Sequence, residues 1–334
     1  MLPLLATLAS SVSLIHAAPL TVDLDAPAAR VAPEVVGAIG LRTRDNRLWT
    51  LRVDDLDGLI LVSSGVQVYR PDGWWQVHTG TTSDGATTVG WTLAGPVGPL
   101  PSVPLADPGC GMPDPAGLTH YNSRTMLLHV SPALLVTETI GEADCGGAHG
   151  AAWDELESAS LSAGTTFTGR AVDEVFGAEA ERLWREAGAR ARALDDQPDC
   201  FQPEPTQWGL VRAQGRWTLR GRLHYGPEVC RGMALDYTVP VAVPRALTGP
   251  DNLPAPWASL VAAHPGLRDA LASPDGRMLL LVDAGGVTLT VDGLDIDRME
   301  LPGATVVAAQ WATGAEAAGW MGEGSPLAVG RYAD

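Results

Sequence analysis

Two clusters of aspartates are the first residues whose types and spacing could do chemistry. The clusters consist of Asp54, Asp55 and Asp57, and of Asp292, Asp295 and Asp297. Each follows a predicted strand, and carboxylate oxygens at this spacing can bind calcium. Neither cluster matches the EF-hand pattern, and aspartate also favours β-turns because its carboxylate accepts hydrogen bonds from nearby backbone amides. We therefore expect turns at both places, with calcium binding as the alternative and no resident cofactor.

The chain has four cysteines, an even number that favours disulfides in an oxidising compartment: Cys110, Cys145, Cys200 and Cys230. We expect bridges between Cys110 and Cys145 and between Cys200 and Cys230, because each pair encloses a short stretch of chain. The alternative is a zinc site, since Cys145 and His149 form a C-x-x-x-H pair. No CxxC motif accompanies that pair, and the spacings match no standard structural zinc site.

Trp74 and Trp75 are the candidate ligand-binding residues, in a chain with 11 tryptophans. Exposed indole rings can stack on sugar rings or on peptides. If the pair continues a strand, one ring points to each face of the sheet. We therefore expect one ring in the core and the other exposed or covered by a loop, and the predicted partner is an unknown protein or carbohydrate ligand.

The sequence contains no GxSxG, HExxH, Walker or GxGxxG motif, and no cysteine in a reactive context. His224, on a predicted strand, and His264, at a predicted helix end, are typical of structural residues, so no catalytic residue is assigned. These observations favour a non-catalytic binding or structural module. The alternative is a secreted hydrolase whose active site is assembled from residues far apart in the sequence.

Alternation of apolar and polar residues predicts a mainly β, antiparallel fold. The predicted strands cover residues 47–53, 59–62, 66–69, 125–130, 133–140, 208–212, 216–225, 278–282, 287–291 and 305–311. One long amphipathic helix is predicted over residues 171–194, and a shorter helix over residues 254–263. Residues 94–117 and 195–205, rich in loop-forming residues, are predicted to be irregular, and Asp154, Glu155 and Glu157 are expected on a solvated face or loop.

The chain is expected to consist of a β-rich half over residues 19–200, ending in the long helix, and a second β-rich half over residues 201–334. Weak internal similarity supports related halves. Residues 40–52 are similar to residues 209–220, and residues 59–73 to residues 279–293. Coincidence is the alternative, because antiparallel hairpins share this pattern.

The sequence Ser273-Pro274-Asp275-Gly276, followed by an apolar strand and a second strand, resembles a blade of TolB-like and WD40-like β-propeller repeats. The resemblance covers about 20 residues, whereas a WD40 blade has about 40 to 45. It implies a propeller-like arrangement as an alternative to two related halves. The SPDG turn occurs once and the long helix is atypical of a propeller, so no functional residue is assigned from this resemblance.

The formal net charge is −17, and all 22 basic residues are arginine. This charge repels nucleic acid phosphates and anionic lipid headgroups, so neither partner is expected. Residues 2–15 are mainly apolar but too short to span a bilayer, and small residues and Pro19 follow. We therefore predict a signal peptide over residues 1–18, no membrane span in the mature chain, and a periplasmic or extracellular location. The alternative is a buried N-terminal strand or helix, since the first basic residue is Arg30.

Overall fold

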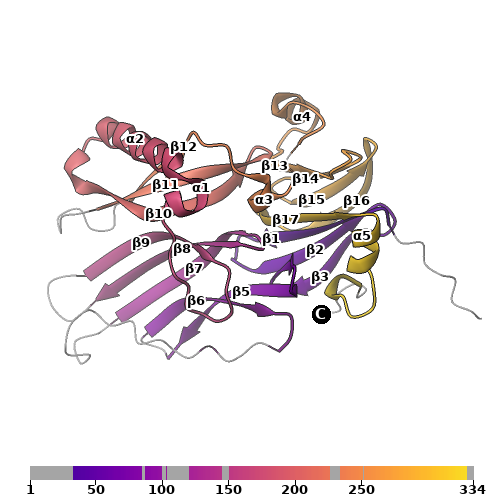
Figure 1. The fold of residues 1–334 in the computed structure, drawn as a ribbon, viewed down its shortest axis with the longest axis horizontal. Coiled ribbons are helices and arrows are strands. Elements are labelled where there is room, and N and C mark those ends of the chain that lie inside the picture. Colours follow the sequence, from indigo (N-terminus) through magenta and orange to yellow (C-terminus); the bar gives the residue numbers. More distant parts are fainter. Residues whose placement is uncertain are drawn as a thin grey trace, which may run out of the picture. The chain divides into compact units, whose positions relative to one another are not determined.

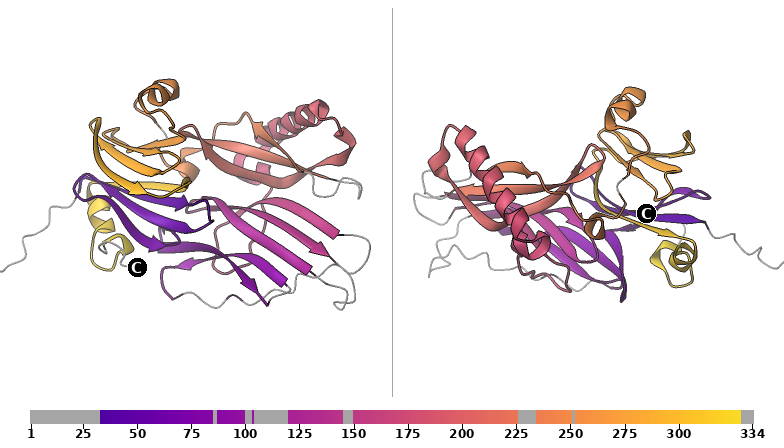
Figure 2. Two further views of the ribbon diagram at one scale, coloured as in Figure 1. Left: turned by 180° about the vertical axis from the view of Figure 1, so that it is seen from behind. Right: turned by 45° about the horizontal axis from the view of Figure 1, so that its top comes forward.

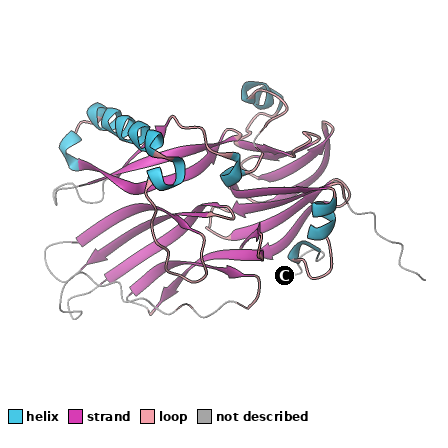
Figure 3. Cartoon of the chain, in the orientation of Figure 1, coloured by secondary structure: helices cyan, strands magenta, loops and turns pink. Residues whose placement is uncertain are grey.

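The computed structural model describes residues 33–84, 87–99, 103, 120–144, 150–225, 234–250 and 252–328 (Figure 1). These residues all belong to one compact unit. The predicted signal peptide 1–18 lies outside them, as do Cys110, Cys145 and Cys230. Strands make up most of the described chain, which confirms the mainly β prediction (Figure 3).

The first sheet joins segments from early and late in the chain. Its strand order is β17-β1-β2-β3, with antiparallel neighbours throughout. The bounds are Val35–Arg42 for β1, Leu48–Asp54 for β2, Gly58–Ser64 for β3 and Thr305–Thr313 for β17. In the β1–β17 ladder Gly37 lies opposite Trp311, so the N-terminal and C-terminal parts of the described chain share one sheet.

The second sheet has nine strands in the order β12-β11-β10-β9-β8-β7-β6-β5-β4. The bounds, in chain order from β4 to β12, are Val66–Arg70, Gly73–Ser83, Thr87–Pro96, His120–Val130, Leu134–Asp144, Gly150–Ser160, Phe201–Ala213, Arg216–Tyr225 and Ala234–Val239. Three antiparallel units of three strands, here called meanders, make up this sheet: β4–β6, β7–β9 and β10–β12.

The meanders are joined by short pairings. The β6–β7 joint is parallel and consists of two residue pairs that begin at Thr87, and the β9–β10 joint is the single pair of Glu157 with Gln207. The sheet is therefore mixed, and its stability at the two joints depends on side chains more than on the backbone ladder.

The third sheet is a four-stranded antiparallel meander in chain order, β13-β14-β15-β16. Its strands are Asp269–Ala272, Met278–Val282, Gly286–Val291 and Leu294–Glu300. Ser273 and Gly276 form the predicted turn, closed by a 2.9 Å hydrogen bond from the Gly276 amide to the Ser273 carbonyl. The predicted hairpin is also confirmed, with Met278 opposite Val291 and Val282 opposite Val287.

The helices are short apart from α2, Ala178–Leu194. The others are Val172–Phe176 (α1), Arg245–Thr248 (α3), Trp257–Ala263 (α4) and Ala315–Trp320 (α5), with 3₁₀ turns at Pro198–Cys200 and Pro326–Ala328. α2 packs on the β10–β12 meander (Figure 2). None of the helices in the described part of the chain is both long enough and apolar enough to cross a membrane.

The prediction of one continuous helix over residues 171–194 is wrong at Gly177, which separates α1 from α2. Gly177 has a φ of 85°, a left-handed conformation that glycine adopts without steric cost and that ends a helix. The apolar side of α1 and α2 nonetheless faces the core: Trp184 is fully buried, Phe176 and Leu183 are partly buried against the same core, and Arg185 is exposed, although Leu194 at the end of α2 is 89% exposed.

Two loop predictions also need correction. Residues 195–205 include the 3₁₀ turn Pro198–Cys200 and the start of β10, so this stretch is only partly irregular. Asp154, Glu155 and Glu157 lie within β9, which pairs with β8 along its whole length. Pairing partners, which local composition does not reveal, impose the strand conformation there.

The largest cluster of buried apolar side chains spans all three sheets, with members that include Ile39, Leu156, Leu210, Leu280 and Val306. The predicted halves 19–200 and 201–334 therefore meet in a common core. None of the three described sheets closes into a barrel, and no propeller is present among the described strands.

The two predicted internal repeats differ in outcome. Residues 40–52 and 209–220 both lie in hairpins, β1–β2 and β10–β11. By contrast, residues 59–66 cover β3 and β4, which belong to different sheets, whereas residues 279–287 form the β14–β15 hairpin. The second similarity is therefore not structural, because a sequence of strand, tight turn and strand does not determine whether the two strands pair.

Candidate functional site

Three aromatic side chains from distant parts of the chain form a cluster. Tyr69 of β4 and Trp74 of β5 are opposite each other in the sheet, with ring centroids 5.3 Å apart. Trp320 of α5 contacts both, at 5.6 Å from Tyr69 and 5.0 Å from Trp74, the latter edge to face. Tilted and edge-to-face pairs of this kind are favourable because the positive edge of one ring meets the negative face of another. The cluster therefore links α5, which packs on β17 and β1 of the first sheet, to the edge of the nine-stranded sheet.

The predicted tryptophan pair is divided between the two faces of β5. Trp75 is 8% exposed, lies in the core beside Val68, and has the Arg70 guanidinium 4.1 Å from its ring centroid. Trp74 is only partly buried and packs on the opposite side, in the Tyr69 and Trp320 cluster. Alternation along the strand explains this division. Trp75 is thus a core residue, and Trp74 supports the wall of a cleft.

A cleft of about 340 Å³, here called the aromatic cleft, lies next to this cluster. Its lining includes Tyr69, Ser131, Gln310, Trp311, Glu316 and Trp320. These side chains come from β4, the β7–β8 turn, β17 and α5. Sequence reasoning missed all six, because the ladder and the helix docking that bring them together join segments far apart in the chain.

Gln310 holds β4 and β17 together at the cleft. Its side-chain amide accepts a hydrogen bond from the Tyr69 backbone N–H at 2.6 Å and donates one to the Tyr69 carbonyl at 2.9 Å. The two strands belong to different sheets, so this paired contact takes the place of a backbone ladder between them. Gln310 therefore positions Tyr69, and its polar atoms are already used.

Two indole N–H groups at the cleft have no acceptor among the described residues. The Nε1 atoms of Trp311 and Trp320 are both buried, and Trp320 as a whole is only 4% exposed. A buried donor without a partner costs about 1–3 kcal/mol. Glu316, by contrast, is exposed and offers carboxylate oxygens at the same cleft. The cleft thus presents aromatic surface and an exposed carboxylate, with two unsatisfied indole donors buried in its wall.

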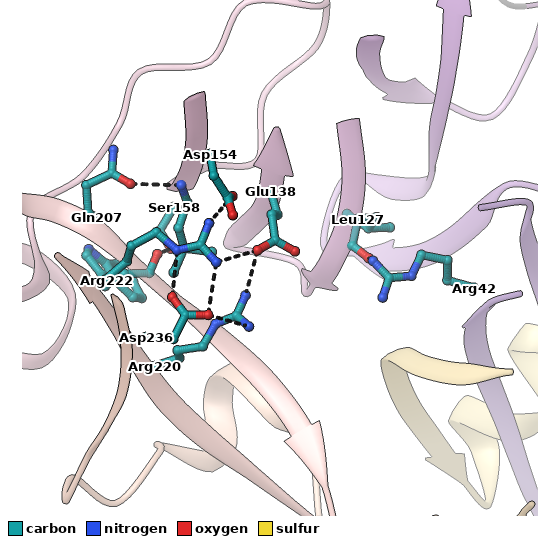
Figure 4. A network of polar contacts seen from close by, with 11 residues as sticks. Arg42, Leu127, Glu138, Asp154, Ser158, Gln207, Arg220, Arg222 and Asp236 are labelled. Carbon is teal, nitrogen blue, oxygen red and sulfur yellow. Dashed lines mark hydrogen bonds and ion pairs between the residues drawn. The ribbon is translucent and has the colours of Figure 1, made fainter. Parts of the chain in front are cut away.

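A second polar assembly, centred on Arg222 of β11, is structural (Figure 4). The Arg222 side chain is 3% exposed and contacts Asp236 at 2.6 Å, Glu138 at 2.5 Å, and Asp154. Burial alone would lower the pKa of Arg222, but its hydrogen bonds and ion pairs with Asp236 and Glu138 outweigh burial and raise that pKa. Arg220 joins the same carboxylates. Every charge in this network has an opposite partner.

The position of the Arg222 network explains its role. Glu138 and Asp154 lie on the β7–β9 meander, whereas Arg222 and Asp236 lie on the β10–β12 meander. The backbone ladder between these meanders is the single pair of Glu157 with Gln207. The ion pairs therefore bridge the joint that the ladder leaves weak. Asp154, expected on a solvated face or loop, is instead a member of this bridge, and burial raises its pKa more than Arg222 lowers it.

The predicted aspartate clusters are engaged in turn contacts and ion pairs. Asp54 is buried, accepts hydrogen bonds from the Leu56 and Asp57 amides at 3.0 and 2.6 Å, and pairs with Arg52 at 2.9 Å. Asp57 also pairs with Arg52, and Asp55 is the third member of the turn.

In the other cluster Asp292 pairs with Arg277 at 3.1 Å, and Asp297 accepts a 3.0 Å hydrogen bond from the Leu59 amide. Asp295 is exposed on β16. Asp297 thus reaches β3, beside the first cluster. Within the described ranges no three His, Cys, Asp or Glu side chains are grouped so that they could hold a metal ion.

Of the four cysteines, Cys200 lies within the described residues, where it is buried and disulfide-bonded. Cys110, Cys145 and Cys230 lie outside the described residues, so both pairings remain predictions. His129, a histidine on β7, is fully buried against Trp217 and lines none of the clefts described here.

A third polar feature bears on the hydrolase alternative. Glu157 lines a cleft of about 280 Å³ together with several threonines, and burial raises the pKa of its carboxyl. Paired acid and base groups, or a nucleophile with its base, are needed for hydrolysis. Among the described residues that line this cleft, Glu157 is the one carboxylate, and threonine hydroxyls surround it.

No known relative decides between these possibilities. The chain matches no model of a known protein family, and a search of curated proteins finds no similar sequence. The geometry of the clefts is therefore the evidence for what the protein binds.

Proposed function

We propose that this protein is a non-catalytic binding module that holds a carbohydrate in the aromatic cleft. The observation that carries the proposal is the pair of buried indole N–H groups of Trp311 and Trp320, which lack an acceptor among the described residues. They line a cleft of about 340 Å³ beside the Tyr69, Trp74 and Trp320 cluster. Concave, largely apolar sites with a few unpaired polar groups are typical of ligand-binding sites.

The chemistry of the lining favours a carbohydrate over a purely apolar ligand. Aromatic rings offer faces for the C–H surface of a sugar ring. The indole groups of Trp311 and Trp320 donate hydrogen bonds, whereas the carboxylate of Glu316 accepts them. Hydroxyl groups do both, so a polyol can satisfy donors and acceptors in one cleft.

The test is a titration of the full chain with cello-, chito- and malto-oligosaccharides, followed by tryptophan fluorescence and calorimetry. We expect at least one series to bind, and Trp311→Ala to weaken binding about tenfold or more, equivalent to about 1.4 kcal/mol. Glu316→Gln, an exposed substitution that should leave folding intact, is expected to weaken binding as well because it removes two of the acceptor sites.

Trp257→Ala is the matched control, because Trp257 on α4 is partly buried and lies outside the aromatic cleft. It should leave carbohydrate affinity unchanged. The proposal fails if no oligosaccharide series binds the wild-type chain, or if Trp257→Ala and Trp311→Ala reduce affinity equally.

We propose further that the protein is exported, to the periplasm or the extracellular medium. The apolar segment 2–15 and the disulfide at Cys200 support this location, since disulfides persist in oxidising compartments. N-terminal sequencing of the secreted protein should begin after Ala17 or Ala18. Recovery of intact chain with Met1 from the cytoplasm alone would contradict the proposal. Non-reducing peptide mapping then tests the predicted bridges from Cys110 to Cys145 and from Cys200 to Cys230.

We propose further that the fold contains structural repeats, as the similarity of residues 40–52 to residues 209–220 indicates. The three meanders of the nine-stranded sheet, their short joints, and the similar β1–β2 and β10–β11 hairpins support this view. Hydrogen exchange should then show each meander opening as a unit, because exchange follows cooperative blocks of structure. Uniform protection across all nine strands would contradict it.

A further inference from the structure

A third cleft, of about 580 Å³, lies at the opposite end of β7 and β17 from the aromatic cleft. It is lined by the β1–β2 turn, by β7, by the segment before β13 and by the β14–β15 and β16–β17 turns. Its charged lining residues are Arg42, Arg44, Arg124 and Arg268. No carboxylate is among the described residues that line it, although the chain as a whole carries a net charge of −17. We call this site the arginine cleft.

The arginines of this cleft differ from most others in the structure. Ion pairs with carboxylates engage arginines throughout the described chain, for example Arg52, Arg222 and Arg298. Arg44 and Arg124 form no ion pair with any residue that the structure describes, although carboxylates are abundant. Arg268 is likewise unpaired within the described ranges. Like charges gathered without counter-ions repel one another, so the arrangement is stabilised when an anion binds.

Two contacts fix the β1–β2 turn against β7. Arg42 Nη1 donates a hydrogen bond to the Leu127 carbonyl at 3.0 Å, and Asn46 Nδ2 donates one to the Thr125 carbonyl at 2.9 Å (Figure 4 for Arg42). Thr125 directly follows Arg124, so the same contacts position Arg124 relative to the turn. Burial lowers the pKa of Arg42, the charge of Glu138 opposes that effect, and the nearby charges of Arg220 and Arg124 add to it. The cations are therefore held together on fixed backbone.

We propose that the arginine cleft binds a phosphate group, either as inorganic phosphate or as part of a small phosphorylated molecule. Guanidinium groups match phosphate oxygens in pairs of parallel hydrogen bonds, and several of them can neutralise its two negative charges. The acidic surface of the whole chain repels an extended polyanion such as a nucleic acid, whereas a small anion can enter a locally cationic cleft.

The test is calorimetric titration of the full chain with inorganic phosphate, pyrophosphate and a sugar phosphate, at low ionic strength and at physiological ionic strength. Saturable binding of at least one phosphate probe is expected. Arg124→Gln and Arg268→Gln should each weaken it at least tenfold. Both side chains are exposed and have no carboxylate partner among the described residues, so these substitutions should leave folding intact.

Arg216→Gln is the matched control: Arg216 on β11 is exposed, and it too has no described ion-pair partner, but it lies outside the cleft. The Arg216→Gln variant should bind phosphate with the affinity of the wild type. The proposal is overturned if no phosphate probe binds, if sulfate and chloride displace phosphate at equal concentration, or if Arg216→Gln is as damaging as Arg124→Gln. Trp311→Ala should not change phosphate affinity. Failure of the phosphate proposal can therefore be distinguished from failure of the carbohydrate proposal.

Discussion

Trp311 lies across the backbone of Gly37, its partner in the β1–β17 ladder. A Cβ built on Gly37 would stand 2.7 Å from Cζ3 of the indole ring. The ring can occupy this position only because Gly37 has no side chain. One wall of the aromatic cleft is therefore set by a glycine on a strand that does not itself line the cleft.

Gly37→Ala should displace the Trp311 ring. Overpacking of this kind costs about 1–3 kcal/mol of folding free energy. The shift should also weaken carbohydrate binding and change the tryptophan fluorescence of the folded protein. Gly95→Ala is the control, since a Cβ at Gly95 of β6 meets nothing within 4 Å. Equal effects of the two substitutions on fluorescence and unfolding would show that Trp311 does not depend on Gly37.

His129 should make folding sensitive to acid. Burial lowers the pKa of its imidazole to about 3, with a backbone contact to Leu247 opposing and the charge of Arg212 adding to the shift. The unfolded chain, with a histidine pKa near 6.5, therefore takes up a proton that the folded chain excludes. The free energy of unfolding therefore falls as the pH drops from about 6.5 towards 3. His129 contributes about 3 kcal/mol of this loss at pH 4.

His129→Leu removes this proton uptake from the unfolded state. Denaturant unfolding at pH 7 and pH 4 should show that the stability loss between the two values is smaller in the variant by about 3 kcal/mol. The carboxylates titrate in both proteins and cancel in the comparison. An identical loss in wild type and variant would mean that His129 is protonated in the folded protein.

Arg222→Met should be among the most destabilising single substitutions in this fold. It leaves Asp154 without a cation, and it leaves Glu138 and Asp236 with Arg220 as their one remaining cation in the network. Removal of one partner of a buried ion pair costs about 3–5 kcal/mol. Thermal and denaturant unfolding would measure the loss.

Arg182→Met is the control for Arg222→Met. Arg182 pairs with Glu179 and Glu186 on α2, but all three side chains are exposed, and exposed pairs contribute little. Its unfolding should match that of the wild type. Addition of Glu138→Gln and Asp154→Asn to Arg222→Met should recover part of the lost stability. Similar unfolding of Arg222→Met and Arg182→Met would mean that the network does not bridge the meanders.

Periodicity predicted the strands whose own residues alternate or are apolar throughout, such as β14 and β17. It did not predict β9, Gly150–Ser160, because that segment has small and acidic residues and no β-branched ones. The strand conformation there comes from an antiparallel ladder with β8 over the full length of both strands. Similarly, the helical stripe gave no sign of the interruption at Gly177, which depends on one residue's backbone conformation.

The candidate site was predictable only in part. A Trp-Trp pair in a strand predicted one core ring, which is Trp75, and a second ring that is exposed or covered by a loop. Trp74 is instead partly buried against Trp320 of α5. The cleft beside Trp74 depends on Trp311 and Trp320, which reach it through the β1–β17 ladder and the docking of α5. Contacts between such distant segments leave no trace in local spacing. The sequence likewise did not indicate that Arg44, Arg124 and Arg268 lie in one cleft, because each comes from a different segment of the chain.

Leu280→Asp should cost several kcal/mol, because it places an unpaired charge in a strand that is covered on both faces. All five residues of β14 are buried, and β14 lies between β13 and β15, so it is a central strand of its sheet. The matched control is Ile296→Asp on β16, the edge strand of the same sheet, where the side chain is 54% exposed. A thermal melt should show a large loss for Leu280→Asp and almost none for Ile296→Asp. If the two variants melted alike, β14 would have to be accessible to water on at least one face, and the core shared by the three sheets could not include Leu280.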